Sequence, residues 1–469
     1  MRRALRWPGR FRDWLAIQRW RLIAVALSFA LFAACTTLTP AVRPAPSALA
    51  PAFSAELADL PLRNAAFERA WRIVDERFYD PGFNGLDWAG ARLRYLPQLE
   101  RVDSDTAFYA LLGRMVGELR DSHTRVYNAR AYRNRLDYVV STVGLRVAEV
   151  EGEVAITQVF PDTDAARAGL AAGMIVEAVN GEAARARLAR LRVEAPADAS
   201  PERRMRGVYG RLIAASRDKP VRLDVRASRD ALSVAQYKLD RTEREEPLVV
   251  THRMLGSNIG YIAFNRFRPQ AVADIGRALG TMQDSDGLVL DLRGNSGGSI
   301  GAMLSIAQSF FPESRHVLTR RLRASDPAGR DGGLSPPLRL ASPEVRVSAS
   351  AHAYTRPLAV LVDGNSASSA ELLATILREQ RDAWIVGRPS CGCVVAVRGT
   401  GYPLPGGGAL YVAESGFITP LGNRMEGAGM HPDREVPLAL EDLREGVDRD
   451  LVVAMDWIRQ RAYRVAEEH

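Results

Sequence analysis

Apolar side chains in the first quarter of the chain beyond residue 60 recur every three or four positions. Phe67, Trp71, Val74 and Phe78 fall mostly on one helical face, and a second stripe runs through residues 106–119. This period is typical of amphipathic helices that cover a core on one side. The pattern predicts a helical N-terminal unit over residues 62–135.

The period shortens over residues 136–242, where brief apolar runs alternate with turn signals such as Asn180-Gly181. Such runs are typical of strands, so this part is predicted to be a β-rich module. Its expected elements, in chain order, are strands at 138–140, 144–147, 154–156 and 173–181, helices at 182–191 and 208–214, and strands at 221–225 and 232–239.

Strand and helix patterns alternate over residues 243–469, which favours an α/β fold with largely parallel strands. The predicted elements are strands at 259–264, 287–292, 358–362 and 384–386, and helices at 271–282, 299–310 and 370–380. Residues 312–353 are rich in Arg, Pro, Gly and Ser, and we expect a long surface insertion there. The fold class is therefore multi-domain α/β.

Length and charge agree with this organisation. A chain of 469 residues is too long for one core, so two or three domains are expected. The net charge is +8, but seven Arg and one Asp within residues 1–35 account for +6 of it. The remaining chain is nearly neutral, and we predict no nucleic-acid partner.

The N-terminus has the features of an export signal. An Arg-rich start precedes an apolar run from Leu22 to Ala34, which is short for a membrane span. Cys35 follows small residues and is a lipidation candidate, so the chain is expected to be exported to the periplasm of a bacterium or anchored to a membrane as a lipoprotein. Plain cleavage and retention as an anchor stay open. Residues 1–35 are thus the signal segment, and the Pro- and Ala-rich residues 36–61 are a linker.

The other two cysteines, Cys391 and Cys393, are too close in sequence for an easy disulfide. No Cys or His pair has zinc-like spacing, so no metal site is predicted. We interpret both residues as small side chains in a loop or strand, and we expect no cofactor.

Ser368 follows a buried strand and a Gly turn, at the start of a predicted helix. Unpaired N–H groups at a helix start stabilise developing negative charge, as the nucleophile turn of hydrolases requires. Taken alone, the residue is more often an ordinary helix cap. A second segment, Asp291-Leu-Arg-Gly-Asn-Ser-Gly-Gly298, also ends a strand, and its glycines let N–H groups approach a reacting oxygen. It lacks the ending of a phosphate loop.

Together these two segments resemble the C-terminal processing protease family, which carries an Asp-Leu-Arg-x-Asn-x-Gly-Gly loop and then Ser-Ala-Ser-x-x-Glu. The resemblance covers about residues 62–440. It implies a protease core of the crotonase/ClpP-like type over residues 243–469 and a PDZ-like domain over residues 136–242. By this match Ser368 is the nucleophile. The N–H groups of Ser369 and of Gly297 or Gly298 form the oxyanion hole.

The chain departs from the family's Ser/Lys pattern, because Cys393 stands where the lysine is expected and the only lysines are Lys219 and Lys238. The tricorn-like branch uses a histidine preceded by serine, which His123 and Ser122 resemble. His123 would be the general base, with activity rising through an ionisation near neutral pH. That branch also places a glutamate before Gly-x-Gly-x-x-Pro-Asp, and Glu426 matches it as the residue that orients His123 through Ser122.

The segment Gly144-Leu145-Arg146-Val147 resembles the PDZ loop that captures a peptide C-terminus through N–H groups. A plain strand in a domain that only gates the core is the alternative. The resemblance implies a serine endopeptidase without cofactors that cleaves unfolded or tail-exposed polypeptides, recognised by their C-terminal tails. The rival function is a catalytically inactive peptide-binding scaffold. A hydrolase acting on other compounds also stays open.

Overall fold

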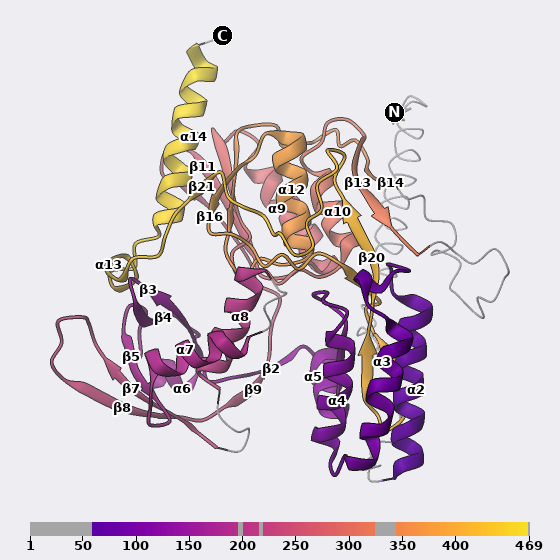
Figure 1. Cartoon of the computed structure of the whole chain (residues 1–469). Coiled ribbons are helices and arrows are strands. Elements are labelled where there is room, and N and C mark those ends of the chain that lie inside the picture. The colour runs from indigo at the N-terminus through magenta and orange to yellow at the C-terminus, as the bar shows by residue number, and fades with distance from the viewer. Residues whose placement is uncertain (1–58, 196–199, 215–218, 324–343, 468–469) are drawn as a thin grey trace, which may run out of the picture. The chain divides into compact units, whose positions relative to one another are not determined.

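The computed structural model describes residues 59–467, apart from residues 196–199, 215–218 and 324–343 (Figure 1). The described residues belong to one compact unit. The predicted export signal, the linker up to residue 58 and Cys35 lie outside the described residues. Every helix that the structure describes is too short or too polar to span a bilayer.

The centre of the C-terminal part is a six-stranded sheet in which only the first pairing is antiparallel. Its strands, in spatial order, are β10 (Val250–Leu255), β11 (Ile259–Phe264), β12 (Gly287–Asp291), β15 (Leu358–Val362), β16 (Trp384–Gly387) and β21 (Arg434–Glu435). This confirms the α/β prediction for the core.

Helices cover both faces of this sheet, as the unbroken apolar runs of its strands require. In β12, Leu288 and Leu290 pack with helices α9 (Pro269–Thr281), α10 (Ile300–Gln308) and α12 (Ser369–Arg381). Val289, which points to the other face, packs against Ile458 of helix α14 (Arg449–Glu467). Successive strand residues point to opposite faces, so both faces of β12 are buried.

Strands β12 and β15 are parallel neighbours, with Leu288 paired to Leu358 and Asp291 to Leu361. Their carboxyl ends therefore lie at the same edge of the sheet. The Gly-rich segment follows β12 and the Ser368 segment follows β15. Two motifs some 70 positions apart in sequence are thus brought together by strand pairing, at the edge where open α/β sheets bind ligands.

The predicted helical N-terminal unit contains α2 (Leu60–Arg77), α3 (Trp88–Tyr95) and α4 (Asp105–Gly117). Its core also contains later residues, among them Val395, Leu410 and Val412. Strand β1 (Arg125–Tyr127) pairs with β19 (Ala409–Tyr411) just before the short helix α5 (Ala129–Leu136). The chain after Thr124 is therefore fastened to the C-terminal part.

Residues 139–245 form mainly antiparallel sheet. A two-stranded ribbon joins β2 (Val139–Thr142) to β9 (Thr242–Glu245). The larger sheet has the order β3–β4–β5–β7–β8, with β6 beside β5. Its strands are β3 (Leu145–Val150), β4 (Glu153–Val159), β5 (Ile175–Val179), β6 (Glu182–Ala183), β7 (Val221–Arg226) and β8 (Val234–Leu239). Helices α6 (Asp164–Arg167), α7 (Ala184–Glu194) and α8 (Pro201–Leu212) accompany it, and β3 is an edge strand.

Two predictions about elements need correction. Helix α8 begins at Pro201, seven positions before the predicted start, because Ser200 caps it and proline suits a first turn. The expected insertion at 312–353 contains strands β13 (Arg315–Arg321) and β14 (Glu344–Val347), which pair with each other, and β13 also pairs with β20 (Ala413–Ile418). Its described ends are therefore parts of a sheet.

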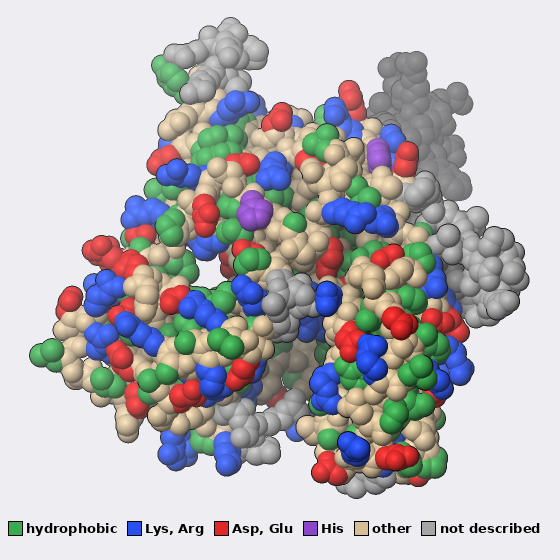
Figure 2. Space-filling view, in the orientation of Figure 1, with side chains coloured by type: hydrophobic (Ala, Val, Ile, Leu, Met, Phe, Trp, Pro, Cys, Tyr) green, Lys and Arg blue, Asp and Glu red, His purple; other side chains and the backbone are tan. Residues whose placement is uncertain are grey.

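Basic and acidic side chains are mixed on the face seen in Figure 2, where blue and red atoms alternate over most elements. This face shows no continuous basic stripe of the kind that follows a nucleic-acid backbone. The view agrees with the near-neutral charge of the chain beyond residue 35.

Candidate active site

Ser368 occupies a sharp turn between β15 and α12. Its φ of +58° and ψ of −119° are rare for a residue with a side chain. Such strained backbone at a strand-to-helix turn is the geometry of hydrolase nucleophiles. The residue is partly exposed, while Ala367 and Ser369 beside it are buried. The turn thus presents the Ser368 hydroxyl at the start of a helix.

The Gly-rich loop lies directly against this turn. A side-chain carbon at Gly297 would sit 2.7 Å from Ser368 Cβ, so only glycine fits there. The Ser369 hydroxyl donates to the Gly298 carbonyl at 3.0 Å. Gly297 donates its own N–H to Asn295 Oδ1 at 2.9 Å, whereas the N–H groups of Gly298 and Ser369 make no hydrogen bond to a described residue. Of the predicted donors, Gly298 and Ser369 are therefore the available pair.

Glu371 stabilises the turn at Ser368 through hydrogen bonds to its carboxylate. It is fully buried and accepts hydrogen bonds from Ser368 N at 2.9 Å, Gly392 N at 2.7 Å and Cys393 N at 3.0 Å, and from the Ser390 hydroxyl at 2.5 Å. Burial raises its pKa, although these donors work in the opposite direction. All its oxygens are engaged, so Glu371 positions the nucleophile segment.

His123 lies in a hydrogen-bonded chain with Ser122 and Glu426. The Ser122 hydroxyl lies 2.5 Å from His123 Nδ1 and donates to Glu426 Oε2 at 2.9 Å. The Ser122 N–H also donates to Glu426 Oε1 at 2.7 Å. A hydroxyl that donates to Glu426 accepts from Nδ1–H, which leaves Nε2 of the neutral imidazole as a proton acceptor. The structure brings these three predicted residues together.

One short loop fastens both halves of the site. Cys393 N donates to Glu371, and the next residue, Val394, donates its N–H to Glu426 Oε2 at 2.6 Å. The carboxylate behind the nucleophile and the carboxylate behind the histidine are thus held by consecutive peptide groups. Among the described residues no hydrogen bond joins Ser368 directly to His123. The peptide groups of Cys393 and Val394 therefore connect the nucleophile segment to the histidine.

The pKa of His123 is lowered to about 3, mainly by burial and further by the charges of Arg125, Arg135 and neighbouring arginines. At neutral pH the imidazole is therefore uncharged, as a base must be. The expectation that it titrates near neutral pH needs correction. Burial also raises the pKa of Glu426, against the hydrogen bonds from Val394 and Ser122.

Two family profiles match this chain. Residues 258–436 match the profile described as Peptidase family S41, and residues 63–117 match that of the Tricorn protease C1 domain.

Residues 258–436 form a family S41 peptidase domain. The carboxyl-terminal-processing protease of Picosynechococcus sp. is 28% identical over 382 residues, which cover 79% of this chain and 82% of that relative. The protein is a serine-type peptidase, and the resemblance inferred from the two motifs is confirmed.

Solved structures show the same fold. The photosystem II D1 C-terminal processing protease superposes with a TM-score of 0.50 and 24% identity, over 82% of this chain and 96% of that one. Mature CPAF superposes with a TM-score of 0.62 and 11% identity, over 87% of this chain and 97% of that one. The fold extends beyond the S41 domain to most of the chain.

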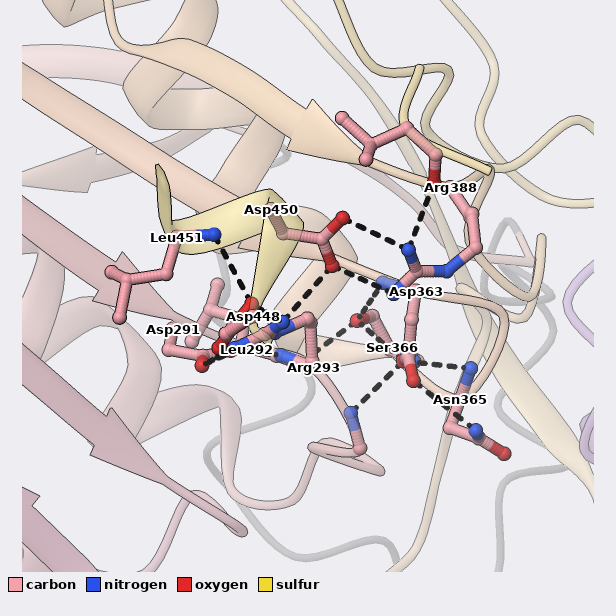
Figure 3. A network of polar contacts seen from close by, with 12 residues as sticks. Asp291, Leu292, Arg293, Asp363, Asn365, Ser366, Arg388, Asp448, Asp450 and Leu451 are labelled. Carbon is pink, nitrogen blue, oxygen red and sulfur yellow. Dashed lines mark hydrogen bonds and ion pairs between the residues drawn. The ribbon is translucent and has the colours of Figure 1, made fainter. Parts of the chain in front are cut away.

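A buried ionic network anchors the Gly-rich loop of the S41 domain (Figure 3). Arg293 pairs with Asp291 at 2.6 Å, Asp448 at 2.7 Å and Asp450 at 2.9 Å, and Arg388 also pairs with Asp450 at 2.8 Å. Burial alone would lower the pKa of Arg293, but the carboxylates outweigh it and leave it raised. The network ties the loop to the first turn of α14.

Asp363 extends this anchoring toward the nucleophile. It accepts hydrogen bonds from the N–H groups of Gly294 at 2.9 Å and of Asn365 and Ser366 at 3.0 Å (Figure 3). Burial would raise its pKa, but these donors lower it. Asp363 therefore joins the turn after β15 to the loop after β12.

Cys391 and Cys393 of the S41 domain form a disulfide, with their Cα atoms 5.3 Å apart. The expectation that they are too close in sequence was wrong, because the loop turns at Gly392, whose φ is +70°. Both cysteines are buried and pack on Ala367. Cys393 thus stands beside the nucleophile segment as a cross-link.

The predicted peptide-capturing segment lies at the start of edge strand β3. Gly144 precedes the strand, and Leu145 and Val147 are buried in its core. Arg146 is paired with Gln158 of β4 at a bulge. The outer edge of β3 faces helix α8, which packs beside it.

Some positioning residues were not predicted. Asp121 accepts from the N–H groups of His123 at 2.7 Å and Thr124 at 2.6 Å, which shapes the turn that holds the base. The Asp-x-His-Thr spacing is an Asx-turn signal that was available in the sequence. No sequence pattern pointed to Asp450, which pairs with Arg293 and Arg388. Among the described residues no group of three metal-ligating side chains gathers.

Proposed function

We propose that the protein is an exported endopeptidase that cleaves unfolded or tail-exposed polypeptides through an acyl-enzyme on Ser368. The observation that supports this most strongly is the pair of consecutive N–H donors, Cys393 to Glu371 and Val394 to Glu426. An inactive scaffold has no need for two buried carboxylates, Glu371 and Glu426, that hold a strained serine and an oriented histidine in one site.

In this mechanism His123 Nε2 takes the Ser368 proton as the hydroxyl attacks the substrate carbonyl. The N–H groups of Gly298 and Ser369 stabilise the oxyanion, and His123 then protonates the leaving amine. Water repeats the sequence to release the acyl group. Glu426, acting through Ser122, keeps the Nδ1–H tautomer and stabilises the imidazolium that forms.

We further propose that residues 62–135, 136–242 and 243–469 act as a helical unit, a PDZ-like domain and the protease core. A PDZ domain binds a peptide as an added strand, which requires an unpaired strand edge beside a helix. Edge strand β3 and helix α8 meet that requirement. The names of relatives as carboxyl-terminal-processing proteases favour substrates recognised by their tails. Export and lipid attachment at Cys35 rest on the sequence alone.

A casein hydrolysis assay tests the proposal. The protein without residues 1–35 should degrade casein or another unfolded protein. The Ser368→Ala variant of the same protein should lose all measurable turnover. Ser305→Ala is a matched control, because Ser305 is an exposed residue of helix α10 and its hydroxyl donates only to Gly301 O. Equal hydrolysis by the Ser368 variant and the parent would overturn the assignment.

A further inference from the structure

Asn295 lies in the Gly-rich loop after β12 and is fully buried. Its backbone N–H donates to the Leu292 carbonyl at 3.1 Å, and its own carbonyl accepts from Ala367 N at 3.0 Å. Its side-chain Nδ2 donates to the Phe264 carbonyl at 2.9 Å, while Oδ1 accepts from Gly297 N at 2.9 Å. Both backbone groups and both side-chain atoms of Asn295 are therefore engaged.

The partners of Asn295 come from the ends of three neighbouring strands. Phe264 is the last residue of β11, Leu292 follows β12, and Ala367 lies in the turn after β15. These strands are parallel to one another, so their carboxyl ends lie at one edge of the sheet. A side chain that joins them through backbone groups has to donate and accept at once, which the uncharged amide of asparagine does.

The amide of Asn295 also fixes which glycine N–H stays available. Gly297 and Gly298 have φ values of +90° and +143°, which residues with side chains rarely adopt. Because two adjacent glycines are conformationally free, hydrogen bonds have to hold their peptide planes. Asn295 Oδ1 accepts from Gly297 N, whereas Gly298 N makes no hydrogen bond to a described residue. Without the amide, the Gly297 N–H would be released and would compete with that of Gly298.

The peptide between Gly297 and Gly298 is held from its other side by Phe267. The Gly297 carbonyl accepts from Phe267 N at 2.9 Å, and Phe267 forms a parallel bridge with Gly298. In a planar trans peptide the C=O and N–H bonds point in opposite directions, so this bond turns the Gly298 N–H away from Phe267. The Asn295 amide and the Phe267 N–H thus fix the two peptide groups on either side of Gly297.

We propose that Asn295 is a positioning residue of the oxyanion hole, whose amide binds the Gly297 N–H and leaves the Gly298 N–H as the donor. Oxyanion donors are effective when they are oriented before the charge develops. The bond from Ala367 N to the Asn295 carbonyl relates this orientation to the nucleophile turn. The inference rests on the proposed acyl-enzyme mechanism and adds the residue that orients one of its donors.

The first test is hydrolysis of labelled casein by Asn295→Ala. A donor that acts on the transition state affects kcat and not KM, so we expect kcat to fall roughly 10²-fold and KM to stay within about twofold of the parental value. Asn265→Ala is a matched control, because the Asn265 amide also joins two backbone groups, accepting from Val249 N at 3.0 Å and donating to Pro247 O at 2.9 Å. This control should keep parental kcat. Circular dichroism checks that each variant is folded.

Asn295→Asp gives a second test that preserves the shape of the side chain. An ionised carboxylate cannot donate to the Phe264 carbonyl and adds negative charge beside the oxyanion, whereas a protonated carboxyl donates and accepts as the amide does. Burial and the carboxylate of Asp363 both raise the pKa of an acid placed here, and the charge of Arg293 is offset by its own carboxylate partners. Lower pH therefore restores the neutral form.

We expect the deficit in kcat of Asn295→Asp to be roughly 10²-fold at about pH 7.5 and to shrink to roughly tenfold at about pH 5. The parent protein should stay level over this range, and Asn295→Ala should not recover. Parental kcat of folded Asn295→Asp at about pH 7.5 would overturn the inference, even if Asn295→Ala failed to fold.

Fluorophosphonate labelling measures the same donors without peptide turnover, because the phosphoryl oxygen of the probe occupies the oxyanion hole as Ser368 attacks. Labelling of Asn295→Ala should be slowed by a factor similar to the loss in kcat. Parental labelling and kcat in the folded variant, or a loss confined to KM, overturns the inference. If the parent protein is labelled but does not hydrolyse polypeptides, the proposed function fails and labelling alone decides the inference. A parent that does neither removes both.

Discussion

Ser122 and Glu426 are 304 positions apart in the sequence and are joined by two hydrogen bonds, one from the N–H and one from the hydroxyl of Ser122. The pair fixes which nitrogen of His123 carries the proton. Because the hydroxyl donates to the carboxylate, it accepts from Nδ1, and Nε2 stays available. The contact thus links the turn after α4 to the chemistry at Ser368.

Replacement of Glu426 should therefore impair catalysis without unfolding the protein. We expect Glu426→Gln to lower kcat roughly 10²–10⁴-fold, because the amide can donate to Ser122 and favour the wrong tautomer. Glu379→Gln is a matched control, since that partly exposed carboxylate accepts a side-chain hydrogen bond only from Asn423 among the described residues. Peptide hydrolysis with circular dichroism checks both variants. Near-parental activity of Glu426→Gln in a folded protein contradicts this role.

Ser368 and His123 should act as one unit. We expect His123→Ala and Ser368→Ala each to lower kcat by on the order of 10³-fold or more, and the double variant to be no worse than either single one. Single-turnover kinetics on the three variants measures this. Additive losses would show that the two residues act independently.

The pH profile should report a histidine with a low pKa. Loss of a proton creates the active base, so kcat/KM rises with pH through the pKa of His123, which is lowered to about 3. With a peptide that lacks acidic residues, we expect the rate to be level from neutral pH down to about pH 5. A midpoint between pH 6 and 7 would mean that burial and the arginines do not act on His123 as the structure indicates.

The disulfide should contribute to stability more than to catalysis. The donors from this loop to Glu371 and Glu426 are backbone N–H groups, which survive a change of side chain. We expect Cys391→Ser with Cys393→Ser to lower the free energy of unfolding by about 1–2 kcal/mol, as a short closed loop implies, and to keep most of kcat. Denaturant unfolding and hydrolysis assays measure the two. A folded but inactive double variant would give Cys393 a chemical role.

The ionic network at α14 should be costly to break. Asp450 is 4% exposed and pairs with Arg293 and Arg388, so Asp450→Asn removes the carboxylate partner of Arg388 and one of the three carboxylates that pair with Arg293. We expect a loss on the order of 3–5 kcal/mol in the free energy of unfolding. Asp456→Asn, which breaks the exposed pair with Arg459, should cost about 1 kcal/mol or less. Similar losses for both would contradict the anchoring role of Asp450.

Local pattern was enough to predict the core. Strands at 259–264 and 358–362 and helices at 271–282 and 370–380 lie within one or two residues of the observed elements, because apolar runs and turn residues mark them. The approach of the loop after β12 to Ser368 followed from parallel pairing. Ser122, His123 and Glu426 came from resemblance, since no periodicity joins segments 304 residues apart.

Other features depend on tertiary contact and left no local signal. The pairing of β1 with β19 and the partners of Arg293 are set by packing between distant segments. The disulfide was missed because spacing was weighed without the turn at Gly392. The lowered pKa of His123 arises from burial and from arginines on several segments, which a sequence does not bring together.

In the proposed mechanism Ser368 is an activated nucleophile whose base is His123. The most direct measurement is the rate of covalent labelling by a fluorophosphonate, with the modified residue identified by mass spectrometry. We expect rapid labelling at Ser368 alone, no labelling of Ser368→Ala, and labelling slowed by on the order of 10³-fold in folded His123→Ala. Parental protein that is folded and remains unlabelled, or His123→Ala that labels at the parental rate, would contradict it.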